Sequence, residues 1–367
     1  MPILLKKNSK RRSARRWPSV LLLLAILTGV GWLWWHLKHP QKNSRQKTSA
    51  AVAVQKNSPP APPKKSTPIS PLVIAPQSAT DFPRPVRDVL EAQIALMRHG
   101  ISAGSLDGAI GSQTRAALTA FQRTENLPPT GALDADTRTK LQLDAPWLAD
   151  YVVTTNDLAR LQPIGKTWLE KSQQSVLDYE TILELVAEKS HAHPLLIQKL
   201  NPGVDWANVA AETVLKIPDA EYPEPTDKAA FVVIHLAEKN LEAFDAATNL
   251  ILHCPCSIAA KVEKRPVGEL HVAVVAPNPN YTVNPELFSE SEELQRLGHK
   301  LILPPGPNNP VGVAWIGLDK PGYGMHGTPI PEQVGRTESH GCFRLANWNA
   351  EYLLKLVWVG MPVRVEP

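Results

Sequence analysis

All 35 acidic residues of this 367-residue chain lie after residue 80, and this asymmetry restricts where a domain can fold. Residues 1–80 hold 14 of the 39 Lys and Arg, which leaves 25 basic against 35 acidic side chains in residues 81–367. A remainder with a net charge of about −10 lacks the basic surface that nucleic-acid binding needs. We therefore expect the folded domains beyond residue 80 and no nucleic acid among the partners.

Residues 20–37 form an 18-residue, mostly apolar run, just long enough to cross a bilayer as a helix. Seven Lys and Arg precede the run and four follow it by residue 47, an excess that places the amino terminus in the cytoplasm. Trp32, Trp34 and Trp35 would form an aromatic belt at the outer interface. The sequence thus predicts a cytoplasmic basic tail over residues 1–19 and a single transmembrane anchor in the inner membrane over residues 20–37.

Two alternatives to an anchor stay open for this run. The first is a cleaved signal peptide, although the A-x-A triplet at residues 51–53 lies some 14 residues beyond the run. The second is a buried core helix, which the flanking RRSARR sequence disfavours. Residues 38–85 then hold ten prolines with many Lys, Ser and Gln, a composition that cannot bury enough apolar surface to fold and predicts a linker.

Residues 86–146 contain an internal repeat. The pattern Gly108-x5-Thr114-Arg115-x2-Leu118 recurs 23 residues later from Gly131. Apolar residues at roughly helical spacing surround it, which predicts a small three-helix domain. The segment LDGAIGSQTRAALTAFQRTENLPPTGALDADTRTKL resembles the peptidoglycan-binding domain of cell-wall hydrolases and transpeptidases, and a helical spacer is the alternative.

Residues 147–178 read as a connector, and residues 179–219 as two short helices and a strand. The late L-N-P and the closing L-K-I-P resemble a degenerate LysM repeat, although the usual opening strand with its Gly-Asp turn is missing. Binding of glycan strands and plain structural packing are both open interpretations of this LysM-like segment.

From residue 228 to 367 the apolar pattern changes to period two. Runs such as AFVVIHL, NLILHCPCSI and ELHVAVVAP predict strands of a sandwich-like or barrel-like sheet, and residues 349–357 predict one helix. His326-Gly327-Thr328 and Ser339-His340-Gly341-Cys342 lie in this β-rich domain. Because a thiolate is the attacking species, a Cys with nearby His suggests a nucleophile; a structural Cys, half of a disulfide and a metal ligand are the alternatives.

The stretch from Leu303 to Val363 is similar to the catalytic half of the L,D-transpeptidase (YkuD-type) family, whose signature is a His followed about 14–17 residues later by Ser/Thr-His-Gly-Cys. Upstream, Arg265-Pro-Val-Gly268 resembles the T-P-x-G motif of the family with Arg in place of Thr. The resemblance implies a multidomain chain whose last domain is the β-rich L,D-transpeptidase fold, with its active region in the periplasm or cell-wall space.

The resemblance also assigns roles to residues. Cys342 is implied as the nucleophile, His326 as the general base, and the Gly327 carbonyl as the group that orients the imidazole. The amides of His340, Gly341 and Cys342 would form the oxyanion hole, and Ser339 and His340 would shape the pocket. Arg344 would meet a carboxylate of the substrate, since a guanidinium fork binds carboxylates well.

The implied substrate is peptidoglycan. Cys342 would attack a tetrapeptide stem, release D-Ala and form a thioester, and a second stem would then attack to give a 3→3 crosslink, with no metal or organic cofactor needed. Alternative acceptors of the acyl group are water and a lysine of an outer-membrane lipoprotein. An inactive wall-binding scaffold is the alternative to an enzyme. Cys254 and Cys256 lie in an apolar strand beside His253, where core packing, a redox or disulfide role and a metal site are all open.

Overall fold

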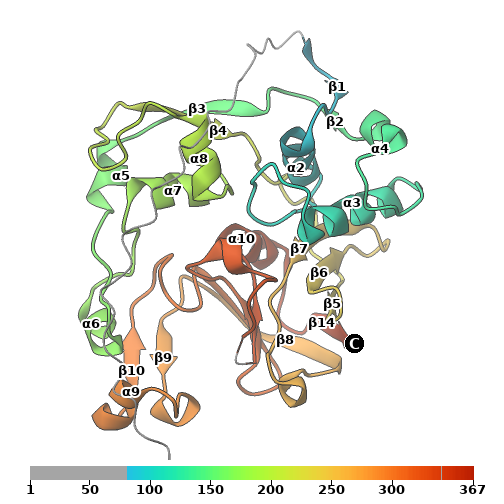
Figure 1. Ribbon diagram of the computed structural model, residues 1–367. Coiled ribbons are helices and arrows are strands. Elements are labelled where there is room, and N and C mark those ends of the chain that lie inside the picture. The colour runs from blue at the N-terminus through green and yellow to red at the C-terminus, as the bar shows by residue number, and fades with distance from the viewer. Residues whose placement is uncertain (1–80, 340) are drawn as a thin grey trace, which may run out of the picture. The chain divides into compact units, whose positions relative to one another are not determined.

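The computed structural model describes residues 81–339 and 341–367, so the predicted tail, anchor and nearly all of the linker lie outside the described residues. Within the described ranges, none of the helices is long and apolar enough to cross a membrane. Three segments follow one another along the described chain, and Figure 1 shows them from blue-green through green and yellow to red.

The first segment is a small domain with three helices, as the repeat predicts. Its elements are β1 (Arg84–Pro85), α2 (Val89–Arg98), α3 (Ser112–Thr124), α4 (Ala135–Lys140) and β2 (Gln142–Leu143). The two short strands pair antiparallel and hold the ends of the domain together. Asp88 caps α2 and Asp134 caps α4, each by accepting a hydrogen bond from the backbone of the first turn.

Two buried glutamines explain why the sequence of this domain repeats. Gln93 accepts from Gly108 N at 2.9 Å and donates to Thr114 Oγ1 at 3.0 Å. Gln122 makes the same pair of bonds with the second copy, to Gly131 N at 2.8 Å and Thr137 Oγ1 at 2.8 Å. Both glycines have positive φ angles, +72° and +62°, which other residues adopt at a cost. The repeated Gly and Thr are therefore the hydrogen-bond partners of two equivalent buried glutamines.

The second segment comprises residues 148–218 and includes the residues interpreted as LysM-like. Its elements are β3 (Leu148–Val152), α5 (Thr155–Ala159), α6 (Trp168–Gln173), α7 (Ile182–Lys189), α8 (Pro194–Leu200) and β4 (Val214–Pro218). β3 pairs antiparallel with β4 over five residues. The stretch interpreted as a connector thus contains a strand, β3, and the helices α5 and α6.

The third segment is built on an eight-stranded sheet with the order β13-β12-β11-β8-β14-β5-β6-β7. The strands are β5 (Phe231–His235), β6 (Asn240–Phe244), β7 (Leu250–Pro255), β8 (Gly268–Pro277), β11 (Ala314–Leu318), β12 (Gly324–His326), β13 (Phe343–Arg344) and β14 (Pro362–Glu366). The predicted last helix is α10 (Asn347–Leu356). The hydrogen bonds join all eight strands, as a β-rich domain requires.

The long strand β8 connects the two halves of this sheet. Its first residues, 268–271, pair with β14, whereas residues 272–277 pair with β11 across a register shift. One strand therefore belongs to both halves of the sheet, in the way that strands form corners between packed sheets. Outside this sheet lie β9 (Tyr281–Val283), β10 (Leu301–Leu303), α9 (Glu292–Leu297) and the short 3₁₀ helices Val262–Lys264, Pro285–Leu287 and Pro331–Gln333.

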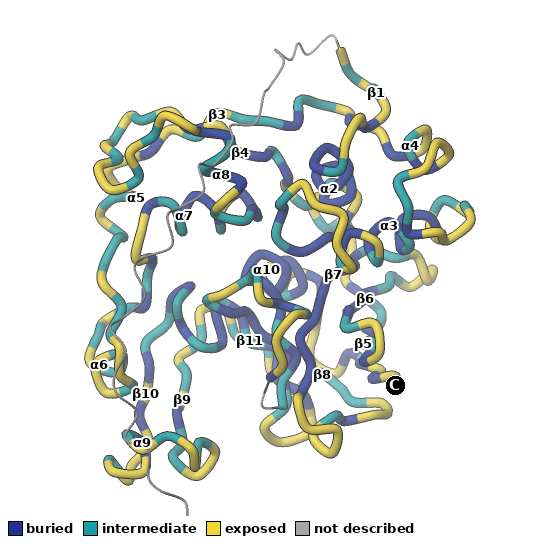
Figure 2. Tube along the Cα trace, viewed as in Figure 1, coloured by how far each residue is buried: buried dark blue, intermediate teal, exposed yellow. Residues whose placement is uncertain are grey.

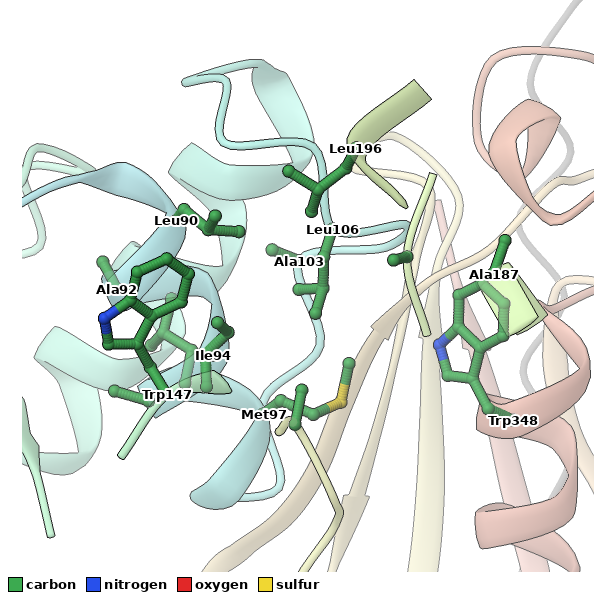
Figure 3. Packing of buried hydrophobic residues seen from close by; sticks show 14 of the residues in the cluster. Leu90, Ala92, Ile94, Met97, Ala103, Leu106, Trp147, Ala187, Leu196 and Trp348 are labelled. Carbon is green, nitrogen blue, oxygen red and sulfur yellow. The ribbon is translucent and has the colours of Figure 1, made fainter. Parts of the chain in front are cut away.

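The described residues form two large hydrophobic clusters, of which one joins the segments. One belongs to the third segment itself. The other is shared by the first two segments and also includes Ala346 and Trp348 at the start of α10. Figure 3 shows side chains of this shared cluster, from Leu90 on α2 to Trp348 on α10. In Figure 2, α10 is largely buried, whereas α6 contains no buried residue.

The first segment also closes the exposed edge of the sheet. β7 is the terminal strand, and its His253 exchanges backbone hydrogen bonds with residues 100–102: Ser102 N donates to His253 O at 2.7 Å, and His253 N donates to Gly100 O at 3.0 Å. Behind this contact, the buried Glu242 carboxylate accepts from Arg123 of α3 and from His253 Nδ1 at 3.1 Å. An open edge strand invites wrong pairing, and this docking removes it.

Candidate active site

Parallel pairing of β12 with β13 brings the predicted base and nucleophile together. His326 lies opposite Arg344, and Met325 opposite Phe343, so Cys342 precedes β13 next to Gly324. Side chains alternate along a strand, so the side chains of His326 and Arg344 lie on one face of the sheet. Cys342 directly precedes β13, and its thiol contacts the carbonyl of Gly322, two residues before β12.

The His326 imidazole is held in one orientation. Its Nδ1 lies 2.6 Å from the Gly327 carbonyl oxygen, and its ring stacks on Trp315 at 5.6 Å between centroids. A carbonyl oxygen can only accept, so Nδ1 carries the proton and Nε2 is left as an acceptor. Burial lowers the pKa of His326 to about 4, against the opposing effect of the Gly327 carbonyl. The imidazole is therefore a neutral base at neutral pH.

The Cys342 thiol is also neutral in this arrangement. Burial raises its pKa to about 11, although the Gly324 amide favours the thiolate. The thiol donates to the Gly322 carbonyl at 3.4 Å. Burial therefore disfavours the charged form of both partners in the resting site. Catalytic hydrogen bonds often tighten only when substrate is bound.

The turn before Cys342 is held by Ser339. Its hydroxyl donates to the Cys342 carbonyl at 2.5 Å and accepts from the Gly341 amide at 3.3 Å. Its backbone is tied to residues 258 and 260. A Cβ built at Gly341 would meet nothing within 4 Å, so this side of the turn is open to a ligand. His340, a predicted oxyanion donor, lies outside the described residues.

Arg344 braces the same turn. Its guanidinium donates to Thr337 Oγ1 at 3.2 Å and to the Glu338 carbonyl. It also lines a pocket of about 220 Å³, together with Lys171 from α6 and Thr328. Two cationic side chains thus border this pocket, and Lys171 was not among the residues predicted from the sequence.

Two further residues near the site carry no signal in the sequence motifs. Tyr281 of β9 interacts electrostatically with Cys342, and burial together with this neighbour raises its pKa to about 12. Asn347, 1% exposed, accepts at Oδ1 from Thr328 N at 3.0 Å. Tyr281 lies 45 positions before His326, so only the fold places it there, whereas Asn347 follows Cys342 by five positions.

Cys254 and Cys256 lie in the core of the third segment as free, fully buried thiols. Burial is the main reason why the pKa values of both are raised. In residues 81–339 and 341–367, no group of three or more His, Cys, Asp or Glu side chains is arranged to hold a metal ion. The observed packing corresponds to the first of the three interpretations of these cysteines.

Residues 229–365 match the YkuD family, described as the L,D-transpeptidase catalytic domain, and residues 86–141 match a family described as "Putative peptidoglycan binding domain". "Probable L,D-transpeptidase YbiS" from Escherichia coli K12 is 29% identical over 171 residues, which cover 46% of this chain and 54% of YbiS. "Putative L,D-transpeptidase YkuD" from Bacillus licheniformis is 24% identical over 51% of this chain and 94% of the relative.

The chain therefore spans about half the length of YbiS. Among solved structures, an L,D-transpeptidase from Mycobacterium smegmatis aligns with 44% of this chain and 76% of its own, at 18% identity and a TM-score of 0.30. The family matches confirm the two resemblances that the sequence motifs indicate. Residues 229–365 thus form a YkuD-type L,D-transpeptidase catalytic domain, and residues 86–141 form a putative peptidoglycan-binding domain.

Proposed function

We propose that the chain is an L,D-transpeptidase that crosslinks peptidoglycan stem peptides through a Cys342 thioester. One observation carries this proposal: a buried imidazole, fixed at Nδ1 by Gly327, lies on the strand that pairs with β13, which begins directly after Cys342. The family match and the wall-binding domain in the same chain support the choice of substrate.

In the first step, Cys342 Sγ attacks the amide carbon that joins the diamino acid at position three of a stem to D-Ala. Nε2 of His326 accepts the thiol proton as the carbon–sulfur bond forms, and returns it to the leaving nitrogen as the carbon–nitrogen bond breaks. The products are a thioester and free D-Ala. Backbone amides of the turn at Gly341 and Cys342 would stabilise the oxyanion.

In the second step, a side-chain amine of another stem attacks the thioester. His326 accepts a proton from the amine and returns it to the departing sulfur, which regenerates the neutral thiol and leaves a 3→3 crosslink. Water or a lipoprotein lysine in place of the amine would give hydrolysis or protein attachment by the same chemistry.

The pocket beside Arg344 is proposed to receive a carboxylate of the donor stem. Arg344 Nη2 already donates to Thr337 and Glu338. The ammonium group of Lys171 adds a second positive charge beside the pocket, which would attract the carboxylate of the donor. Replacing Lys171 by Ala should raise KM for the donor with little change in kcat, because the lost attraction is made equally in ground and transition states. An unchanged KM would remove Lys171 from this role.

We also propose that the chain works in the cell envelope, with residues 20–37 as an inner-membrane anchor and the catalytic domain in the periplasm or cell-wall space. The charge pattern around that run supports this placement. A membrane fraction that retains the intact amino terminus would support the anchor, whereas a soluble species starting near residue 54 would exclude it. Glycan binding by residues 179–219 stays a prediction.

The reaction is tested by mass spectrometry of muropeptides after incubation of the purified protein with disaccharide-tetrapeptide. Dimers that lack one D-Ala and are linked between third residues are expected, and they should vanish in Cys342→Ala. Tripeptide without dimer would show that water is the acceptor. Sedimentation of the same protein with purified sacculi tests the wall-binding domain.

A further inference from the structure

A buried polar contact links the second segment to the start of α10, in the domain that carries Cys342. Glu188 on α7 and Asn347 at the start of α10 are 159 positions apart, and Asn347 Nδ2 donates to Glu188 Oε1 at 2.9 Å. Tyr179 also donates its hydroxyl proton to Glu188 Oε1, at 3.2 Å. The contact joins residues 148–218 to the domain that carries Cys342, although neither residue lies in the catalytic signature.

The surroundings of Asn347 fix which way its amide points. Oδ1 accepts from Thr328 N at 3.0 Å and from Val313 N at 3.4 Å, whereas Nδ2 donates to Glu188 and to the Pro307 carbonyl at 3.3 Å. Backbone N–H groups on one side and oxygen acceptors on the other exclude the flipped amide. Rotation by half a turn would place two donors against each other and two acceptors against each other.

Two glycines give the Asn347 oxygen its place. A Cβ atom at either Gly312 or Gly327 would collide with Asn347 Oδ1, and Gly312 also has a positive φ of +61°. Bare backbone on both sides lets the amide oxygen reach the loop directly after His326. Such close approach is one of the few reasons that require glycine.

The geometry at Thr328 connects this amide to catalysis. The Thr328 N–H that Asn347 binds and the Gly327 carbonyl that His326 Nδ1 contacts at 2.6 Å belong to one peptide group. A peptide group is planar and moves as a unit. Holding its N–H therefore also sets the direction of its carbonyl, and that carbonyl sets the tautomer and tilt of the imidazole.

We propose that Glu188 and Asn347 are positioning residues for His326, and that the second segment completes the catalytic site by supplying Glu188. This inference rests on the proposed function, because it assigns His326 as the base of that reaction. Glu188 orients the Asn347 amide, Asn347 holds the Gly327–Thr328 peptide, and the peptide holds the imidazole with Nε2 free for Cys342. Neither residue touches the substrate.

The ionisation of Glu188 suits this role. Burial raises its pKa to about 8, against the hydrogen bonds from Asn347 and Tyr179. The side chain thus needs only an oxygen acceptor for Asn347, and a glutamine can supply one. A methionine has a similar length and packs well but offers no such acceptor.

The test compares Glu188→Met, Glu188→Gln and the matched control Asp157→Asn in the full chain. Asp157 is a buried carboxylate of the same segment, bound to Thr154 and Lys189 and remote in sequence from the catalytic loop. The rate of Cys342 acylation is measured at saturating and limiting donor. Since misplacement of a catalytic group by about 1 Å costs roughly 10²-fold, Glu188→Met should lower kcat about 10- to 100-fold with KM nearly unchanged.

Glu188→Gln should restore the rate to within about threefold, because the oxygen acceptor is restored. Asp157→Asn should keep the wild-type rate even where it lowers the melting temperature. Proton NMR provides a readout that a purely structural role would not move: the His326 Nδ1–H resonance should shift or broaden in Glu188→Met and stay in place in Asp157→Asn.

Folded Glu188→Met with the wild-type rate and resonance would overturn the inference, and so would a Glu188→Gln variant as slow as Glu188→Met. If Glu188→Met does not fold, Tyr179→Phe and Asn347→Ser take its place with the same expectations and the same refuting result. Failure of the wild-type protein to release D-Ala would instead refute the proposed function, so the two failures are distinguishable.

Discussion

Removal of the imidazole should turn a reaction that is insensitive to pH into one that depends steeply on it. The pKa of Cys342 is raised to about 11 and that of His326 is lowered to about 4, both by burial. Between these values, thiol and base are both neutral, and the wild-type acylation rate should be level from about pH 5 to about pH 10.

In His326→Ala, attack depends on the thiolate that forms without a base. With a thiol pKa of about 11, roughly one Cys342 in 10⁴ is ionised at about pH 7, and roughly one in ten at about pH 10. The variant should therefore accelerate about tenfold per pH unit. At neutral pH its rate should fall about 10²–10⁴-fold below wild type, the usual worth of general-base help.

The assay is the appearance of the acyl-enzyme by intact-protein mass spectrometry, with a carbapenem or a tetrapeptide donor at a series of pH values. Cys342→Ala is the control that must show no adduct. An ultraviolet titration of the thiolate gives the Cys342 pKa independently. A wild-type acid limb near pH 6.5, the ordinary value of histidine, would refute the burial argument, and so would a level profile in His326→Ala.

The remaining predictions concern stability and access. Glu242→Gln should lower the free energy of unfolding by about 3 kcal/mol at neutral pH, because it removes one partner of a buried charge cluster. Burial would raise the pKa of Glu242, but His235, His253 and Arg123 lower it below its ordinary value. The stabilisation by Glu242 is therefore present above about pH 4.5 and is lost as the pH falls through the pKa of the folded state. Thermal melts at several pH values measure it, and a loss that persists at low pH would contradict it. Iodoacetamide should label Cys342 in the native protein and reach Cys254 and Cys256 only after unfolding, as peptide mapping can check. Gly327→Ala should slow acylation while the protein stays folded, because its Cβ would displace Asn347, and an unchanged rate would refute that contact.

The elements predicted from the sequence are those whose pattern is local and long. β5, β7 and β8 were all visible as apolar runs with period two, and α10 differs from its predicted bounds by a residue or two. The glycine and threonine repeat was visible as well, because each copy is bound by its own glutamine.

Shorter or interrupted elements were not predictable in this way. β9, β10, β12 and β13 have only two or three residues, too few for any period to show. β3 was not predicted, because four helices separate it in sequence from β4, the strand with which it pairs. A pattern read along the chain loses a partner that returns after 60 residues.

The candidate site divides along the same line. Cys342 and His326 belong to a compact signature, so the sequence was enough to place them together. Their protonation states depend on burial, and proximity in sequence says nothing about desolvation. Glu188 and Lys171 come from the second segment, and no motif connects them to residues more than 150 positions away.

The contacts between segments change how the accessory parts of this chain are understood. Residues 100–102 pair with the terminal strand β7, and Arg123 reaches the buried Glu242 behind it, so the peptidoglycan-binding domain closes an edge that the catalytic sheet would otherwise leave open. The start of α10 contributes Trp348 to the hydrophobic cluster of the first two segments and Asn347 to the contact with Glu188. Because helix α10 also packs against β11 and β12 of the sheet, displacement of either accessory segment would be felt at the loop after His326. The putative peptidoglycan-binding domain and the YkuD domain are thus coupled through shared packing rather than joined as independent modules.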